Sequence, residues 1–165
     1  MKLSRVVMIL SFLSASLSGE TLKIGDPAPA VITKDHEGQR IDLGAKLSAG
    51  TALVFFYPKA MTPGCTKQAC SLRDGYEELT ARGVSIYGVS SDTAETQAEF
   101  RDKHELPFTL IADTDLKVAG AFGKGRWSRQ AYLFIDGDLV WSDMSASTSK
   151  QAADVLKALD SFSKG

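Results

Sequence analysis

Residues 51–57, Thr-Ala-Leu-Val-Phe-Phe-Tyr, form a continuous run of apolar, β-branched and aromatic side chains that ends at Pro58. Such a run is typical of a strand buried on both faces, which requires helices on both sides of its sheet. Helical periodicity follows in the next segment, with apolar side chains at Ala69, Leu72, Tyr76 and Leu79. Gly83 is placed to end this helix. The two patterns together favour an α/β fold.

The other expected strands lie on both sides of this segment. We expect them at residues 31–33, 40–43, 84–89, 108–112, 131–135 and 139–142, with a short helix at 115–122. The first two form a hairpin, and the last two form another through the turn Asp136-Gly137-Asp138. Strands separated by helices pair in parallel, whereas hairpins pair antiparallel. The sequence therefore predicts one domain with a central mixed β-sheet flanked by helices and an N-terminal β-hairpin.

Two further helix starts carry the pattern of a capping box. Asp92 is followed by Glu95 three positions later, and Thr148 is followed by Gln151. In this pattern the first side chain accepts a hydrogen bond from the helix, and the second reaches back to the cap. Pro107 ends the earlier of these two helices.

Residues 1–19 have the layout of a secretory signal peptide, with Lys2 and Arg5, an apolar run, and then small residues up to Gly19. An uncleaved anchor is the alternative, although the run is short for a bilayer span. Cleavage would leave 20–165 as the domain and move the formal net charge from −1 to −3. We therefore expect an exported protein, periplasmic or secreted, without stable membrane association. This charge gives no reason to expect a nucleic-acid partner.

The two cysteines, Cys65 and Cys70, lie at the start of the helix after residues 51–57. In an exported protein, such a pair most often forms a structural disulfide. Helix geometry opposes this interpretation, because positions five apart differ by about 140° in direction and about 7.5 Å in height. Their Cα atoms are then about 8–9 Å apart, beyond disulfide reach. A bond between them requires the helix to unwind, which favours a switchable redox pair.

The turn before Cys65 is suited to a reactive thiol. Unpaired N–H groups and the dipole at a helix N-terminus favour thiolate over thiol. Pro63-Gly64 allows close approach of the backbone to a small ligand, and Thr62 can cap the helix, direct its hydroxyl to the same pocket, or both. The spacing is not that of a Cys-x-x-Cys dithiol site, and His36 and His104 have no zinc-ligand spacing to the cysteines.

The segment Pro58-Lys59-Ala60-Met61-Thr62-Pro63-Gly64-Cys65-Thr66, followed by Gln68-Ala69-Cys70, resembles the active site of the bacterioferritin comigratory protein/peroxiredoxin Q group of peroxiredoxins. Pro58, Thr62 and Cys65 match the family pattern Pro-x-x-x-Thr-x-x-Cys. The likeness extends over about residues 22–141. It implies a thioredoxin-like fold with an N-terminal extension, and thiol peroxidase activity without a cofactor or a metal.

The resemblance also implies a role for each matching residue. Cys65 would be the peroxidatic nucleophile, Thr62 would hydrogen-bond the peroxide, and Pro58 would shield the thiolate. Cys70 would be the resolving cysteine within the same helix. The family has an arginine just before a late strand, for which Arg129 is the candidate; Arg126, in the same loop, is the alternative.

The function that follows is the reduction of hydrogen peroxide and organic hydroperoxides. Cys65 would become a sulfenic acid, Cys70 would condense with it to a disulfide, and a thioredoxin-like dithiol donor would reduce that bond. We expect a monomer or a weak dimer. A peroxide-sensing redox switch with low turnover is the alternative, and a binding domain with an inert disulfide is a third hypothesis.

Overall fold

The computed structural model describes residues 20–125 and 128–163. The expected signal peptide, residues 1–19, and the alternative arginine, Arg126, therefore lie outside the described residues. Within the described part of the chain, no helix combines the length and the apolar character needed to cross a membrane.

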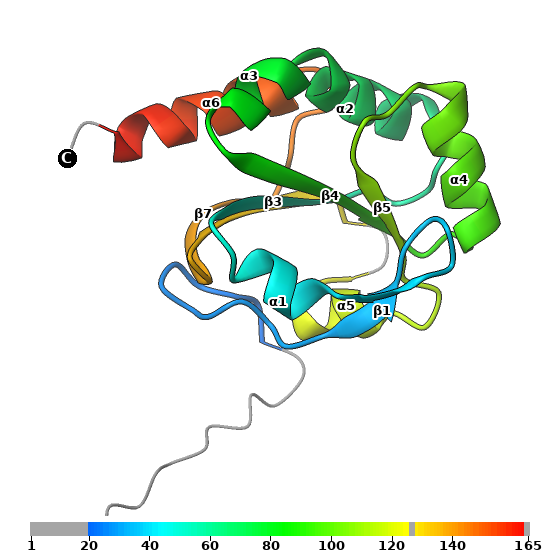
Figure 1. Cartoon of the computed structure of the whole chain (residues 1–165), viewed down its shortest axis with the longest axis horizontal. Coiled ribbons are helices and arrows are strands. Elements are labelled where there is room, and N and C mark those ends of the chain that lie inside the picture. Colours follow the sequence, from blue (N-terminus) through cyan, green and yellow to red (C-terminus); the bar gives the residue numbers. More distant parts are fainter. Residues whose placement is uncertain (1–19, 126–127, 164–165) are drawn as a thin grey trace, which may run out of the picture.

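A five-stranded sheet forms the centre of the molecule, in the order β5-β4-β3-β6-β7 (Figure 1). Its strands are β3 (Thr51–Phe56), β4 (Val84–Ser90), β5 (Thr109–Ala112), β6 (Gln130–Ile135) and β7 (Asp138–Asp143). Strands β3, β4 and β5 run parallel, β6 pairs antiparallel with β3, and β7 pairs antiparallel with β6 at the edge of the sheet. The antiparallel hairpin of β1 (Ile32–Lys34) and β2 (Arg40–Asp42) lies outside this sheet. The mixed sheet and the N-terminal hairpin confirm the sequence prediction.

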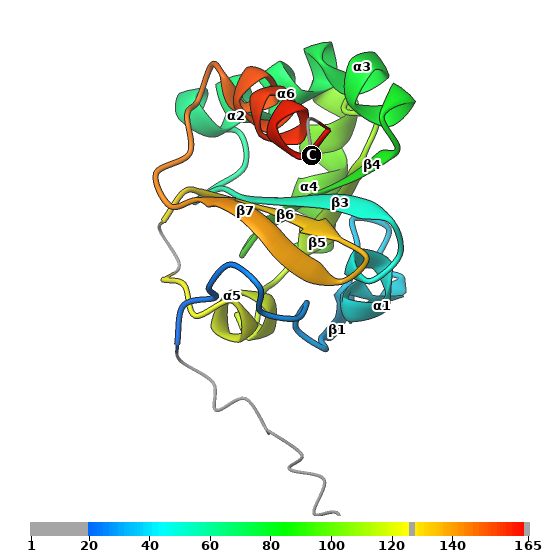
Figure 2. The same cartoon turned by 90° about the vertical axis from the view of Figure 1, so that its left-hand side faces the viewer.

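Helices cover both faces of the sheet, as the strand pattern predicts. One face carries α2 (Pro63–Asp74), α3 (Tyr76–Ala81), α4 (Ala94–Lys103) and α6 (Gln151–Phe162). The other carries α1 (Leu43–Leu47), α5 (Lys117–Ala121) and the hairpin (Figures 1 and 2). Side chains of β3 alternate between the two cores, since Leu53 and Phe55 pack toward α2 whereas Val54 and Phe56 pack toward α5. The strand is buried on both faces for this reason.

The helix expected around residues 65–79 differs from the prediction, because the structure divides it at Gly75 into α2 and α3. At this glycine α6 passes very close: a Cβ on Gly75 would lie 2.7 Å from the Cβ of Ala152. Apolar periodicity continues through the break and so did not reveal it. Helix α1 was also not predicted; the side chain of Asp42 begins it by accepting a hydrogen bond from Ala45 N at 3.0 Å.

Both predicted capping boxes are wrong. Helix α4 is capped by Thr93, whose hydroxyl accepts from Thr96 N at 3.2 Å, and α6 begins after Lys150 without a side-chain cap bond. Asp92 and Gln151 instead make tertiary hydrogen bonds to other elements. The sequence has the cap pattern at both places, but these side chains form hydrogen bonds with residues distant in sequence instead of capping a helix.

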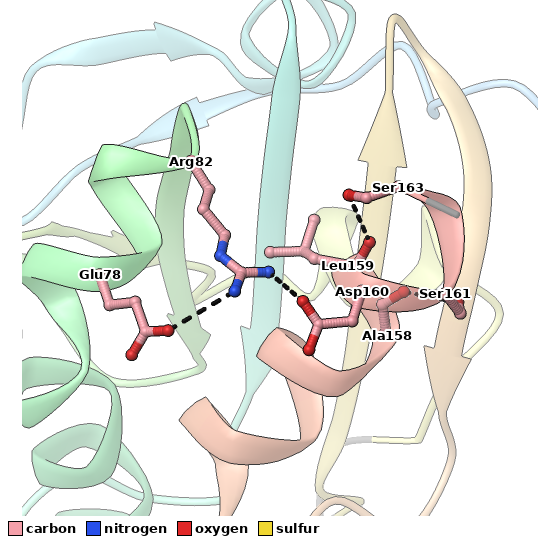
Figure 3. A network of polar contacts seen from close by, with 7 residues as sticks. All are labelled: Glu78, Arg82, Ala158, Leu159, Asp160, Ser161 and Ser163. Atoms are coloured by element: carbon pink, nitrogen blue, oxygen red, sulfur yellow. Dashed lines mark hydrogen bonds and ion pairs between the residues drawn. The ribbon is translucent and has the colours of Figure 1, made fainter. Parts of the chain in front are cut away.

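An ion-pair cluster joins α3 to the second half of α6 (Figure 3). Arg82, which caps the end of α3, contacts Asp160 through Nη1 at 2.6 Å and Glu78 through Nη2 at 3.6 Å. Glu78 and Asp160 are well exposed, so the contribution of the cluster to stability is small. Its geometric effect is to fix the far end of the helix whose first residue, Gln151, reaches the cysteine site.

Candidate active site

Strand β3 delivers the chain to Cys65 through a tight turn. Tyr57 follows the strand and donates its N–H to Val89 O at 3.1 Å, and α2 then begins at Pro63 with Thr62 in the N-cap position. Cys65 is the third residue of α2 and is 1% exposed. The first N–H groups of a helix have no partner within it. The sulfur of Cys65 is thus buried at the positive end of a helix.

Thr62 occupies the N-cap position, but its side chain does not cap the helix. Its hydroxyl instead donates to Lys59 O at 2.8 Å, within the turn that begins at half-buried Pro58. A hydroxyl that donates in this way still has lone pairs that can accept a hydrogen bond. The hydroxyl is therefore placed to accept a hydrogen bond from a ligand rather than to donate one.

Arg129 lies next to Cys65, although the two residues are far apart in the sequence. Its Nη2 is 3.6 Å from Cys65 Sγ, and its Nη1 donates to Gln68 Oε1 at 2.8 Å. Gly64 leaves the space for this approach, because a Cβ there would be 3.0 Å from Nη2. The structure thus places a fixed cation against the buried sulfur; its part in catalysis stays a prediction.

Cys70 is in a different environment on the same helix. It is half-buried in the middle of α2, and both thiols are free. Arg73, one turn further on, donates from Nη1 to His104 O at 2.9 Å. Since α2 is continuous from Pro63 to Asp74, Cys65 and Cys70 lie too far apart along and around it to bond without unwinding.

A buried polar network under the turn was not predicted. The carboxylate of Asp92 accepts from Ala60 N at 2.8 Å and from Ser90 Oγ at 2.6 Å. Gln97 Nε2 donates to Ser90 Oγ at 2.9 Å, and the hydroxyl of Tyr57 donates to Gln97 Oε1 at 2.5 Å. Burial raises the pKa of Tyr57, so the phenol stays neutral and remains a donor. The network ties the turn to the ends of β3 and β4.

A sequence signal for this network did exist. Ser90 and Asp92 come at the carboxyl end of β4, and Pro58 follows the carboxyl end of β3. These two strands are parallel neighbours, so their ends meet at one edge of the sheet, where sites of α/β proteins form. We interpreted Asp92 as a helix cap and missed this alternative.

Gln68 and Gln151 are two further buried polar residues near Cys65, and both are 0% exposed. Gln68 Nε2 donates to Gln151 Oε1 at 2.8 Å, while Gln68 Oε1 accepts from Arg129. Among residues 20–125 and 128–163, no cluster of three or more His, Cys, Asp or Glu is placed to hold a metal ion. The chemistry available at the site is therefore that of a buried thiol, a guanidinium, a hydroxyl and free helix N–H groups.

Comparisons with known proteins show which proteins the chain is similar to. The AhpC/TSA family profile matches residues 24–140. Peroxiredoxin Bcp of Escherichia coli is 43% identical over 112 residues, which cover 68% of this chain and 70% of the relative. Chloroplastic peroxiredoxin Q of Oryza sativa subsp. japonica is 41% identical over 99 residues, 60% of this chain and 45% of the relative.

Solved structures show the same fold. Peroxidoxin BcpB from Mycobacterium tuberculosis superposes with a TM-score of 0.78 at 31% identity, covering 85% of this chain and 97% of that one. Peroxiredoxin Q of Xanthomonas campestris gives a TM-score of 0.75 at 25% identity, covering 85% and 96%. These matches confirm the expected thioredoxin-like fold.

Proposed function

The chain belongs to the AhpC/TSA family as a peroxiredoxin of the Bcp and peroxiredoxin Q group, and from this we propose a thiol peroxidase in which Cys65 reduces hydrogen peroxide and organic hydroperoxides. The observation that carries the proposal is the contact between Arg129 Nη2 and the buried Cys65 Sγ at 3.6 Å, at a helix N-terminus. A thiolate nucleophile and a cation beside it are what cleavage of an O–O bond needs.

In the first step, the thiolate of Cys65 attacks one peroxide oxygen and the O–O bond breaks. The sulfur is oxidised to a sulfenic acid, and the other oxygen leaves as hydroxide or alkoxide and takes up a proton to become water or an alcohol. Arg129 and the first N–H groups of α2 stabilise the negative charge that develops on that oxygen. The hydroxyl of Thr62 accepts the hydrogen bond of the peroxide O–H, while Pro58 shields the thiolate.

In the second step, the thiolate of Cys70 attacks the sulfenic sulfur of Cys65. A disulfide forms, and the hydroxyl of the sulfenic acid leaves as water with the proton from Cys70. Because both cysteines lie in a continuous α2, this step requires the helix to unwind between them.

In the third step, a dithiol donor restores both thiols. One donor thiolate attacks the disulfide, which gives a mixed disulfide and releases one cysteine of this chain. The second donor thiol then attacks the mixed disulfide and releases the other cysteine, so the donor leaves as a disulfide. We propose a thioredoxin-like protein as this donor, because such proteins carry a paired dithiol. Steady-state peroxide consumption with candidate dithiol proteins tests this step. If monothiols recycle the enzyme as well as every dithiol protein does, the proposed donor is wrong.

The test of the proposed function is peroxide consumption by the purified protein with a dithiol reductant. Wild-type protein should turn over many times, and Cys65→Ser should not. If Cys65→Ser retained the wild-type rate, the mechanism would be wrong.

A peroxide-sensing switch is the second candidate, and one observation favours it. The same disulfide must disrupt α2, which packs against α3 and α6, so oxidation would change a surface that a partner can read. Steady-state kinetics separate the two functions: a single stoichiometric oxidation that no dithiol donor reverses indicates the switch.

We also propose export, with residues 1–19 removed and the domain of residues 20–165 acting in the periplasm or outside the cell as a monomer or weak dimer. The positive start, apolar run and small residues support this proposal. The measurement is the intact mass of the protein recovered from each cell fraction. An uncleaved protein in the cytosolic fraction would contradict it.

A further inference from the structure

The guanidinium of Arg129 is the first member of a buried chain of hydrogen bonds, which we call the amide chain and which consists of Arg129, Gln68 and Gln151. Arg129 Nη1 donates to Gln68 Oε1 at 2.8 Å, and Gln68 Nε2 donates to Gln151 Oε1 at 2.8 Å. Both glutamines are fully buried. The amide chain therefore runs from the sulfur of Cys65, across α2, to the first residue of α6.

The direction of the amide chain is fixed by chemistry. A guanidinium has only donors, so Arg129 can bond to Gln68 only through the amide oxygen. The amide nitrogen of Gln68 must then point the other way and needs an acceptor, which Gln151 Oε1 supplies. Were the amide of Gln68 reversed, its nitrogen would face the guanidinium, donor against donor. Gln151 thus selects the one orientation of Gln68 that holds Arg129.

Gln151 itself is costly to bury. Within the described part of the chain, its Nε2 is a buried donor without an acceptor. An unpaired buried donor lowers stability. A methionine of similar size would remove this donor, but it would leave the buried Gln68 Nε2 without its acceptor. The hydrogen bond that Gln151 makes is therefore the one that gives Gln68 Nε2 its acceptor.

We propose that Gln151 is a positioning residue for the peroxide reaction: through Gln68 it fixes the guanidinium of Arg129 beside Cys65 Sγ. Gln151 acts only through the other two members of the amide chain. The start of α6 would thus control the geometry of the reaction, although α6 belongs to the end of the chain and Cys65 to the middle. This inference rests on the proposed function, because it concerns the same reaction.

The experiment measures the second-order rate constant for oxidation of Cys65 by hydrogen peroxide, by rapid quenching and mass spectrometry, together with the thermal unfolding midpoint. Gln151→Met removes the acceptor, and we expect the rate constant to fall about fivefold, the value expected for the loss of one neutral hydrogen bond. Lys150→Met is the matched control at the neighbouring exposed position and should leave the rate unchanged.

The decisive comparison repeats Gln151→Met in the Arg129→Met background. If Gln151 acts through Arg129, its substitution should have no further effect there, because the two changes remove the same interaction. A folded Gln151→Met protein with the wild-type rate, or a fivefold loss that persists without Arg129, would overturn the inference. Should Gln151→Met not fold, Gln151→Asn, whose shorter amide cannot reach Gln68, takes its place in the same cycle.

The two proposals fail in different ways. A wild-type protein whose Cys65 does not react with hydrogen peroxide would refute the proposed function before any variant is compared. A wild-type protein that reacts, with Gln151→Met equal to it, would refute only the role of Gln151.

Discussion

The two cysteines of α2 are the same chemical group on the same helix, yet their surroundings differ in every respect that matters for reactivity. Cys65 is 1% exposed at the helix start, with Arg129 at 3.6 Å from its sulfur. Cys70 is half-buried in the middle of the helix. Their positions on the helix add to this difference, because the unpaired N–H groups and the positive dipole end occur only in the first turn.

The supports around the two cysteines differ as well. The turn before α2 is held by the hydrogen bond from Ala60 N to Asp92, and Gln68, which lies between the two cysteines, bonds to Gln151 of α6. Near Cys70 the corresponding anchor is Arg73, which bonds to the end of α4. A disulfide would therefore require the helix between Cys65 and Cys70 to release the hydrogen bonds of Gln68, whereas the turn before Cys65 could keep its bond to Asp92.

The largest expected effect tests whether Cys65 alone starts the reaction. Cys65→Ser should reduce peroxide consumption to the background rate, because a serine hydroxyl is not ionised at neutral pH and is a poor nucleophile toward peroxide. Coupled reductant oxidation measures this. A rate that remains and depends on Cys70 would reverse the roles of the two cysteines.

Removal of the fixed cation is the next largest effect. Arg129→Met should lower the rate constant for oxidation of Cys65 by about 100-fold, the loss expected when one preorganised donor to a developing oxyanion is removed. The same substitution should leave the alkylation of Cys70 unchanged, since no contact joins Arg129 to that thiol in the described structure. Equal losses at both cysteines would mean that the protein had been disrupted as a whole.

A smaller effect is expected from the network under the turn. Asp92→Ala leaves Ala60 N and Ser90 Oγ without their acceptor, which should lower the free energy of unfolding by about 2 kcal/mol. The turn carrying Thr62 would loosen, and the peroxide rate constant should fall about tenfold. Urea denaturation and rapid-quench kinetics check the two values. Reduced stability with an unchanged peroxide rate would restrict Asp92 to a structural role.

The smallest effect on the first step is expected at Cys70. Cys70→Ser should leave the rate of Cys65 oxidation within about twofold of wild type, because Cys70 lies on the same helix beyond disulfide reach. Sulfenic acid should then accumulate and go on to sulfinic acid, and no intramolecular disulfide should form. Intact-mass analysis during peroxide titration separates these species. A normal disulfide yield, necessarily with another sulfur, would remove Cys70 from the mechanism.

Local patterns predicted the fold well where neighbours in the sequence decide the structure. The buried strand, the hairpins and the separation of the two cysteines on a helix depend on side-chain periodicity and on fixed helix dimensions. The same local logic failed at Asp92 and Gln151, because a cap pattern says what a side chain can do and not which partner competes for it. Those two residues support the candidate site.

The local sequence was therefore enough to place Thr62 at the N-cap, Cys65 in the first turn and Cys70 five residues on. The side chains that surround this segment are set by the tertiary structure. The contacts of Cys65 with Arg129, of Gln68 with Gln151 and of Ala60 with Asp92 span 64, 83 and 32 residues of sequence. Local sequence patterns do not predict such contacts, because the distance between the two residues is set by how the sheet and its helices pack. The position of Cys65 at the helix start could therefore be predicted from the sequence, whereas the side chains around its sulfur could be found only in the folded chain.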